Sequence, residues 1–261
     1  MKKLILIDGN SIAFRAFYGL PLLSNKSGLH TNAIFGYARL LERLIEDEQP
    51  THMLVAFDAG KSTFRHKEYT EYKGGRQKTP PELGEQFAPI RRLIDAYGIK
   101  RYEAEEYEAD DIIGSLSKQA DKEKVKTIIV TGDRDLTQLA SENTTVYFTK
   151  KGISEVDQIT PEVIREEMDI TPEQVIDLKG LMGDKSDNIP GVPGVGEKTA
   201  LRLLHTYGSV ESVLENLSEI SGKKLNENLT NFQEQAILSK RLATIYTEVP
   251  MEFTIDDLEF T

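Results

Sequence analysis

Lys3-Leu-Ile-Leu-Ile7 runs directly into Asp8-Gly9-Asn10 near the start of the chain. An apolar run that ends at a carboxylate recurs before Asp58 (residues 52–57) and before Asp133 and Asp135 (residues 126–130), and a fourth, shorter run spans residues 144–148. Near-continuous apolar runs are typical of strands covered on both faces, as in a parallel sheet. Helical spacing fills the intervals, at residues 32–46, 83–97 and 108–120. This alternation predicts an α/β fold with a mostly parallel central sheet flanked by helices.

The pattern changes to helices alone after about residue 160. Thr160-Pro161-Glu162 and Thr171-Pro172-Glu173 each offer a cap residue, a first-turn proline and an acid, which is a typical helix opening. Further helices are expected at residues 198–207, 209–217 and 225–247. We therefore predict an α/β core at residues 1–160 with an arch at about 61–90, a helical region at 161–250 with a hairpin at 188–200, and a tail or linker at 251–261.

Composition excludes several classes of protein. The 261 residues contain no cysteine and four histidines. Disulfides, thiolate metal sites and cysteine nucleophiles are therefore excluded, and a zinc hydrolase is disfavoured. The longest apolar run near the start, residues 4–7, is too short for a signal peptide or a membrane span. We expect a cytoplasmic protein with no membrane partner.

The net charge of −11 argues against a nucleic-acid partner, but its distribution does not. Lys and Arg outnumber acids from Lys61 to Arg101, whereas residues 102–111 contain acids and no bases. A basic strip beside an acidic cluster fits an enzyme that grips phosphates and holds cations next to them. Charge runs taken alone favour the simpler interpretation that both are solvated helix faces.

Carboxylates collect where a ligand is expected. In open parallel sheets, ligands bind beyond the carboxyl ends of the strands. The candidate set comprises strand-end acids, acids of a helix opening and acids of a polar turn: Asp8, Asp58, Asp133 and Asp135; Glu108, Asp110 and Asp111; Asp184 and Asp187. Any one of them alone is more often a turn former or a helix cap.

If these acids converge, either several of them take up protons or cations must neutralise them. Two carboxylates about 4 Å apart repel by roughly 4 kcal/mol at an effective dielectric near 20. Oxygen-only, charge-rich sites suit Mg²⁺, with Mn²⁺ as a substitute. Two such ions can clamp the attacking water and the leaving oxygen of an in-line phosphoryl displacement. The acids therefore predict two-metal hydrolysis of a phosphate ester.

Two further segments fit a nucleic-acid partner. Within residues 64–81, Tyr72 offers a ring for an unpaired base, and Lys73 and Arg76 offer charge to a phosphate. An ordinary solvated loop is an equal alternative for these residues alone.

Residues 191–200 read Gly-Val-Pro-Gly-Val-Gly-Glu-Lys-Thr-Ala, a glycine-rich turn that opens a helix. Glycines allow close approach of backbone N–H groups to phosphate, and a helix start is positively polarised. We expect a hairpin that holds duplex backbone without reading sequence, through Gly191, Gly194, Gly196 and Lys198.

These motifs resemble those of the 5′ nuclease domains of bacterial DNA polymerase I, which belong to the flap-endonuclease superfamily. The matching segments occur in the family's order across nearly the whole chain: Leu6-Ile-Asp-Gly-Asn10, Phe57-Asp-Ala-Gly60, Tyr107-Glu-Ala-Asp-Asp111, Thr131-Gly-Asp-Arg-Asp135, Gly183-Asp-Lys-Ser-Asp-Asn-Ile-Pro190 and Gly194-Val-Gly-Glu-Lys-Thr199.

The resemblance implies a division of the acids between two ions. Asp8, Asp58, Glu108, Asp110 and Asp111 would serve the first ion, and Asp133, Asp135, Asp184 and Asp187 the second. Tyr72, Lys73 and Arg76 match arch residues that guide the 5′ strand, and the hairpin matches a duplex grip that also holds K⁺ in relatives. The chemistry would rest on Lys73, Arg76, Asp58, Asp110 and Asp133.

The resemblance also implies a biological role. It is the removal of flaps and RNA primers from branched, flapped or nicked duplex DNA during replication and repair. We expect a monomer that forms part of a longer polymerase chain.

Three other classes remain as alternatives. A PIN-like ribonuclease shares strand-end acids but is usually smaller and has fewer of them. A non-catalytic DNA-junction binding module would tolerate loss of the carboxylates, all of which are present here. An Asp-x-Asp phosphatase is disfavoured because Asn10 stands where the second Asp is needed.

Overall fold

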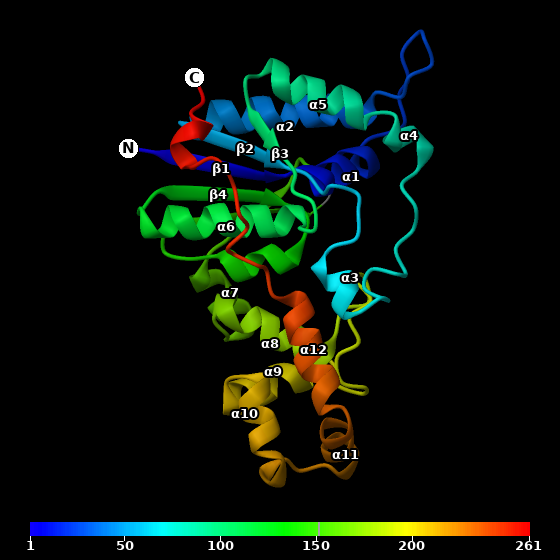
Figure 1. The fold of residues 1–261 in the computed structure, drawn as a ribbon, viewed down its shortest axis with the longest axis vertical. Coiled ribbons are helices and arrows are strands. Elements are labelled where there is room, and N and C mark those ends of the chain that lie inside the picture. The colour runs from blue at the N-terminus through cyan, green and yellow to red at the C-terminus, as the bar shows by residue number, and fades with distance from the viewer. Residues whose placement is uncertain (151) are drawn as a thin grey trace. The chain divides into compact units, whose positions relative to one another are not determined.

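The computed structural model describes residues 1–150 and 152–261 and divides into two compact units (Figure 1). Unit 1 comprises residues 1–63, 78–160 and 246–261, and unit 2 comprises residues 64–77 and 161–245. The chain thus enters and leaves unit 2 twice. The predicted arch is divided at residues 64 and 77, and its central part belongs with the helical region rather than with the α/β core.

Unit 1 is built on one six-stranded sheet with the order β3-β2-β1-β4-β5-β6. The strands are β1 (Lys3–Asp8), β2 (His52–Ala56), β3 (Lys100–Tyr102), β4 (Lys126–Thr131), β5 (Thr144–Thr149) and β6 (Val156–Ile159). All pairings are parallel except that of β5 with β6. The predicted mostly parallel sheet is confirmed, and β3 and β6 are strands that the apolar pattern did not reveal.

Both faces of the sheet are covered, which explains its near-continuous apolar strands. Ile5 and Ile7 of β1 share one core with the helices α1 (Gly9–Gly19), α2 (Asn32–Glu48) and α5 (Phe87–Ala96). The alternate residues Leu4 and Leu6 are equally buried on the other face, along which α6 (Ala109–Lys122) runs (Figure 1). Because side chains alternate between the faces of a strand, the central positions of β1, residues 4–7, must all be apolar.

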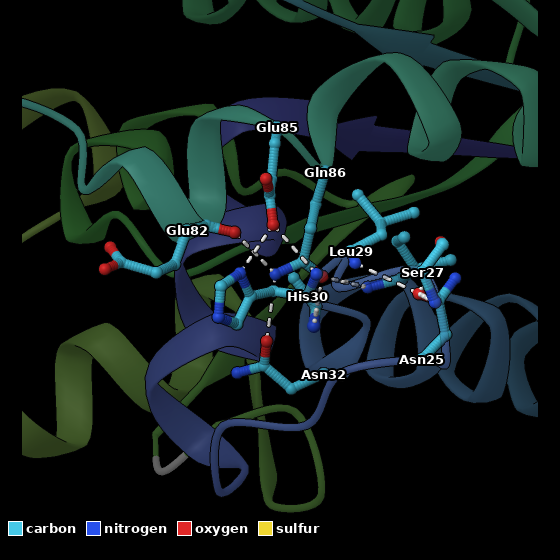
Figure 2. Close-up of polar contacts among 10 residues, drawn as sticks. Asn25, Ser27, Leu29, His30, Asn32, Glu82, Glu85 and Gln86 are labelled. Atoms are coloured by element: carbon cyan, nitrogen blue, oxygen red, sulfur yellow. Dashed lines mark hydrogen bonds and ion pairs between the residues drawn. The ribbon is translucent and has the colours of Figure 1, made fainter.

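Two buried amide side chains fix the start of α2 (Figure 2). Oε1 of Gln86 accepts hydrogen bonds from the backbone N–H groups of Ala33 (2.8 Å) and Ile34 (3.1 Å), and Nε2 of Gln86 donates to Oδ1 of Asn32 (2.9 Å). The first N–H groups of a helix have no partner within it, so Gln86 acts as a cap supplied from elsewhere in the chain. It lies between α4 (Pro81–Gly84) and α5, and it anchors the end of the predicted arch to the sheet unit.

The last residues of the chain are part of unit 1. The backbone N–H of Phe260 donates to the carbonyl of Thr51 (2.7 Å), and the ring of Phe253 meets that of Tyr102 edge-on at 4.9 Å. Residues 255–258 form a 3₁₀ turn that begins with a reciprocal cap between Thr254 and Asp257. The expectation of a tail or linker at 251–261 is therefore wrong, and the Thr-x-x-Asp spacing is the sequence signal for this turn.

Unit 2 is helical. Its helices are α3 (Phe64–Glu68), α7 (Pro161–Met168), α8 (Val175–Met182), α9 (Glu197–Tyr207), α10 (Val210–Glu215), α11 (Lys223–Asn231) and α12 (Gln233–Ala243). The single helix predicted at 225–247 is two helices, because Phe232 leaves the helical conformation (φ −117°, ψ 31°). One core cluster joins Tyr72 to Ile189, Leu242 and Ala243 and so packs residues 64–77 onto this unit.

Candidate metal centre

The site begins where the strand order reverses. β1 and β4 are neighbours at the switch between strands that extend to one side and strands that extend to the other, and such a point opens a crevice beyond the strand ends. Asp8 ends β1 and is 4% exposed, and its Oδ2 accepts a hydrogen bond from the hydroxyl of Thr131 at the end of β4 (2.8 Å). Burial, and then the charge of Asp8, raise the pKa of Tyr37. The predicted crevice therefore contains a buried carboxylate.

Asp133 and Asp135 follow β4 in the same corner. The backbone N–H of Asp133 donates to the hydroxyl of Thr131 (2.9 Å), so Thr131 connects Asp133 to Asp8. Oδ1 of Asp133 accepts the backbone N–H of Asp135 (2.9 Å), and the two side chains have carboxylate oxygens within 4.8 Å of each other. Thr131 is a positioning residue that our interpretation of the sequence missed, although it opens the quoted Thr-Gly-Asp motif.

Asp58 links the end of β2 to the start of α6. Its Oδ1 accepts the backbone N–H of Ala109 (2.8 Å), and its own N–H donates to Oδ1 of Asn10 (2.9 Å). In the sequence, Asn10 served only as evidence against a phosphatase. In the structure, its side chain holds the backbone of Asp58, a predicted metal ligand. The hydrogen bond to Ala109 places the Asp58 carboxylate at the positive end of α6.

Acids of α6 are set by its first turn. Glu108 is the N-cap and is 6% exposed, Asp111 is 0% exposed, and Asp110 is half-buried. A reciprocal cap joins Glu108 to Asp111, since each side chain accepts the other's backbone N–H. The helix dipole favours an acid at each of these positions, and the reciprocal cap gives Glu108 and Asp111 a further structural role that Asp110 does not share.

Unit 2 contains the other two predicted ligands. Oδ1 of Asp184 accepts hydrogen bonds from the backbone N–H (2.9 Å) and hydroxyl (2.6 Å) of Ser186, and Oδ2 accepts one from Nζ of Lys179 (3.0 Å). Burial alone would raise the pKa of Asp184, but these hydrogen bonds and the Lys179 charge hold it below its ordinary value. Asp187 is 4% exposed and forms an ion pair with Arg76.

The predicted phosphate-gripping residues lie against that same turn of unit 2. The backbone N–H of Lys73 donates to the carbonyl of Asp187 (2.8 Å), and Nδ2 of Asn188 donates to the carbonyl of Glu71 (2.7 Å). Tyr72 is 5% exposed and packs in the core of unit 2. A stacking contact with a base would require this ring to leave its core, so that role of Tyr72 stays a prediction.

The glycine-rich hairpin is held from α12. The N–H of Gly191 donates to the hydroxyl of Ser239 (2.9 Å), and Nε2 of Gln235 donates to the carbonyl of Gly191 (2.7 Å). Gly191 has a positive φ of 62°, and a Cβ there would lie 2.3 Å from the backbone nitrogen of Gly183, so only glycine fits. Gly194 also has a positive φ (78°), Gly196 is the N-cap of α9, and Lys198 lies in its first turn.

The donor set fits hard divalent cations. Every predicted ligand offers carboxylate oxygen, which Mg²⁺ and Mn²⁺ prefer, and several of these carboxylates are more than nine-tenths buried. The acids of unit 1 follow three strands that are neighbours in the sheet, β2, β1 and β4, or lie at the start of α6.

Outside position 151, none of the helices has the length and apolarity needed to cross a bilayer.

Comparison with known proteins gives matches over the whole chain. Residues 3–169 match the model of the 5'-3' exonuclease N-terminal resolvase-like domain, and residues 170–261 match the 5'-3' exonuclease C-terminal SAM fold. DNA polymerase I of Bacillus subtilis is 61% identical over 259 residues, which is 99% of this chain and 29% of that protein. DNA polymerase I of Streptococcus pneumoniae is 53% identical over 264 residues, covering 100% of this chain and 30% of that protein. The chain thus spans about three tenths of the length of these relatives.

Solved structures agree with this match. A structure of the T5 5'-exonuclease with divalent metal ions (zinc) bound has a TM-score of 0.76 and 25% identity, covering 94% of this chain and 90% of that one. The catalytic core of Rad2 in complex with DNA substrate shares the fold at a TM-score of 0.60 and 15% identity, covering 97% of this chain and 82% of that one. With both family domains present in order, the chain belongs to the 5'-3' exonuclease family.

Proposed function

We propose that this chain is a structure-specific 5′ nuclease that hydrolyses phosphodiester bonds of flapped, branched or nicked duplex DNA and of RNA–DNA primers. Membership of the 5'-3' exonuclease family supports the reaction class. The observation that carries the proposal is the buried acid Asp8, joined through Thr131 to Asp133 at the switch point of the sheet. A buried carboxylate linked in this way to a second, half-buried carboxylate fits a cation.

We propose Mg²⁺ as the working ion, with Mn²⁺ able to replace it. The first ion would take its ligands from Asp8, Asp58, Glu108 and Asp110, and the second from Asp133, Asp135, Asp184 and Asp187. We assign Asp111, the ninth predicted ligand, to neither ion. The metal ions bound in the T5 relative support a divalent centre. Asp184 and Asp187 belong to unit 2 and the other acids to unit 1.

When bound, the two ions would supply an activated water and the countercharge for an in-line displacement. The protein's own residues do the rest. The hydroxyl of Thr131 holds the Asp8 carboxylate and the backbone N–H of Ala109 holds that of Asp58, which keeps these carboxylates oriented for the ions. Lys73 and Arg76 would offer cationic groups to the scissile phosphate and so stabilise the charge of the transition state.

We propose that the hairpin holds the duplex. Gly191, Gly194, Gly196 and Lys198 would contact the sugar-phosphate backbone, and K⁺ would bind at the same turn. Such contacts fix position without reading sequence, as a structure-specific nuclease requires. A monomer within a longer polymerase chain is part of the same proposal, which the length of the relatives supports.

A flap cleavage assay tests the function. A 5′-labelled flap duplex is incubated with the protein and either Mg²⁺ or EDTA, and the products are sized. Short 5′ products that require Mg²⁺ are expected. A retarded but uncut duplex in both conditions would instead identify a non-catalytic junction-binding module, and cleavage of single-stranded RNA alone would favour a PIN-like ribonuclease.

A further inference from the structure

Asp111 is the most completely buried of the nine predicted ligands. It is 0% exposed in the first turn of α6. Its Oδ2 accepts the backbone N–H of Glu108 (3.0 Å), and its Oδ1 accepts the backbone N–H of Tyr246 (2.9 Å). Each carboxylate oxygen therefore already receives a backbone N–H. Asp111 is thus completely enclosed and held by two backbone N–H groups, whereas Asp58 and Asp110 are half-buried.

The second of these bonds secures the chain where it returns to unit 1. Residues 246–249, here called the return segment, follow α12 and lie along α6. One helical turn beyond Asp111, the hydroxyl oxygen of Ser115 accepts the backbone N–H of Val249 (2.9 Å) and its proton goes to the carbonyl of Asp111 (2.7 Å). The ring of Tyr246 stacks on that of Tyr107 (5.5 Å, 14° between planes). One face of α6 is thus a dock for the return segment.

The adjacent acid points elsewhere. Successive residues of a helix are rotated by about 100°, so Asp110 and Asp111 cannot share one direction. Asp110 is half-buried, whereas Asp111 is completely enclosed. The N–H of Ala109, one residue earlier, donates to Asp58, which follows β2. The start of α6 is therefore held by both Asp58 and Asp111, with Glu108 at its N-cap and Asp110 in its first turn.

We propose that Asp111 is not a metal ligand but a positioning residue, which ties the return segment to the start of α6 and thereby fixes Glu108 and Asp110 for the metal. The inference rests on the proposed metal centre. It replaces the sequence-based assignment of Asp111 to the first ion and adds the backbone of Tyr246 to the residues that set the site. Partners that orient metal ligands typically change metal affinity about 10–100-fold when they are lost.

Two charge-matched variants separate the roles. Asp111→Asn and Asp110→Asn each remove one negative charge, and bound Mn²⁺ is counted by electron paramagnetic resonance during titration. Asp111→Asn should keep the wild-type number of bound ions with about 10-fold weaker affinity. Asp110→Asn should lose an ion. Loss of an ion in Asp111→Asn as well would overturn the proposal.

A backbone variant tests the same bond without touching the acid. Tyr246→Pro removes the N–H that Asp111 accepts, and Tyr246→Ala removes the ring while keeping the N–H. Tyr246→Pro should weaken Mn²⁺ binding as Asp111→Asn does, and Tyr246→Ala should bind Mn²⁺ more tightly than Tyr246→Pro. Equal Mn²⁺ affinity in Tyr246→Pro and wild type would contradict the inference.

Amide hydrogen exchange keeps this inference distinct from the proposed function, because it needs no metal. The Tyr246 amide should lose protection in Asp111→Ala, which removes both acceptor oxygens, and keep it in Asp110→Ala. Unchanged protection of Tyr246 in Asp111→Ala would overturn the positioning role whatever the metal data show. A wild-type protein that binds no Mn²⁺ while this exchange pattern holds would count against the proposed metal centre alone.

Discussion

Arg76 forms an ion pair with Asp187 inside unit 2, and the backbone N–H of Lys73 binds the carbonyl of the same aspartate. The Asp187 side chain is 6% exposed, whereas that of Arg76 is 49% exposed. A predicted arch residue therefore neutralises a predicted metal ligand. A divalent ion that binds the same Oδ1 of Asp187 would compete with the guanidinium, which on release would be available to a phosphate.

Arg76→Ala should therefore tighten metal binding while slowing the reaction. The ion pair is half exposed on the arginine side, so the gain should not exceed about fivefold in Mn²⁺ affinity, equivalent to ~1 kcal/mol. Lys78→Ala removes the same charge two residues away and is the matched control. Mn²⁺ titration checks the result, and weaker Mn²⁺ binding in Arg76→Ala than in Lys78→Ala would contradict the competition.

Asp133→Asn should remove cleavage and leave the fold intact. Loss of a carboxylate that holds a catalytic ion removes several kcal/mol of transition-state stabilisation, so turnover on a flap duplex should fall by roughly 10³-fold. The exposed Glu142→Gln is a control with the same charge change. Single-turnover rates and circular dichroism provide the comparison. Turnover of Asp133→Asn equal to that of Glu142→Gln would remove Asp133 from the site.

Lys73 combines backbone strain with a proposed catalytic role. Its φ of 57° lies in the left-handed region, which costs a residue with a Cβ roughly 1–2 kcal/mol. Lys73→Gly should be more stable than Lys73→Ala by about 0.5–1 kcal/mol, after allowing for the extra freedom of glycine in the unfolded chain. Both variants should lose roughly 10²–10³-fold in kcat, because both lack the ammonium group. Denaturant melts and flap kinetics test this, and wild-type kcat in Lys73→Gly would refute it.

A buried ion pair supports the helices around the hairpin. Nζ of Lys240 lies 2.7 Å from Oδ1 of Asp177, which also accepts the N–H of Val210 and is 5% exposed as a residue. Lys240→Met should cost about 3 kcal/mol of unfolding free energy, because it strands a buried carboxylate. Glu211→Gln, which changes the exposed partner of the same lysine, should cost less than about 1 kcal/mol.

The pH dependence of this stabilisation has a definite sign. Burial alone would lower the pKa of Lys240, but hydrogen bonds to Asp177 and Glu211 raise it above its ordinary value of 10.5. A group whose pKa is raised by folding contributes its stability below the unfolded pKa and loses it as pH rises through the folded value. With both carboxylates ionised, the gap in unfolding free energy between wild type and Lys240→Met should therefore be constant from neutral pH up to about 10.5 and narrow above it. A gap that widens with rising pH would contradict the assignment.

The strands and the acids of the sheet edge were predictable because they are local patterns. Runs such as residues 3–7 must be apolar on both faces, and an acid directly after such a run must lie at the strand end. β3 escaped prediction because it consists of the polar residues Lys-Arg-Tyr, with the first two exposed. The division of the predicted arch between the two units was also not predicted, because it depends on the packing of Tyr72 with Leu242, which is far away in the sequence.

The roles of individual acids were less predictable than their presence. Asp110 and Asp111 are chemically identical neighbours, and the hydrogen bond that distinguishes them joins Asp111 to a residue 135 positions away. The buried ring of Tyr72 likewise looks, in sequence, like any tyrosine among basic residues. A long-range hydrogen bond sets the role of Asp111, and burial sets that of Tyr72. Neither feature leaves a local signal in the sequence.

The most direct test of the account is anomalous diffraction from a crystal of the protein soaked in Mn²⁺. The account predicts anomalous peaks beyond the carboxyl ends of β1 and β4, within coordination distance of Asp8, Asp110 and Asp133. A fully soaked crystal with no peak among these carboxylates would contradict it.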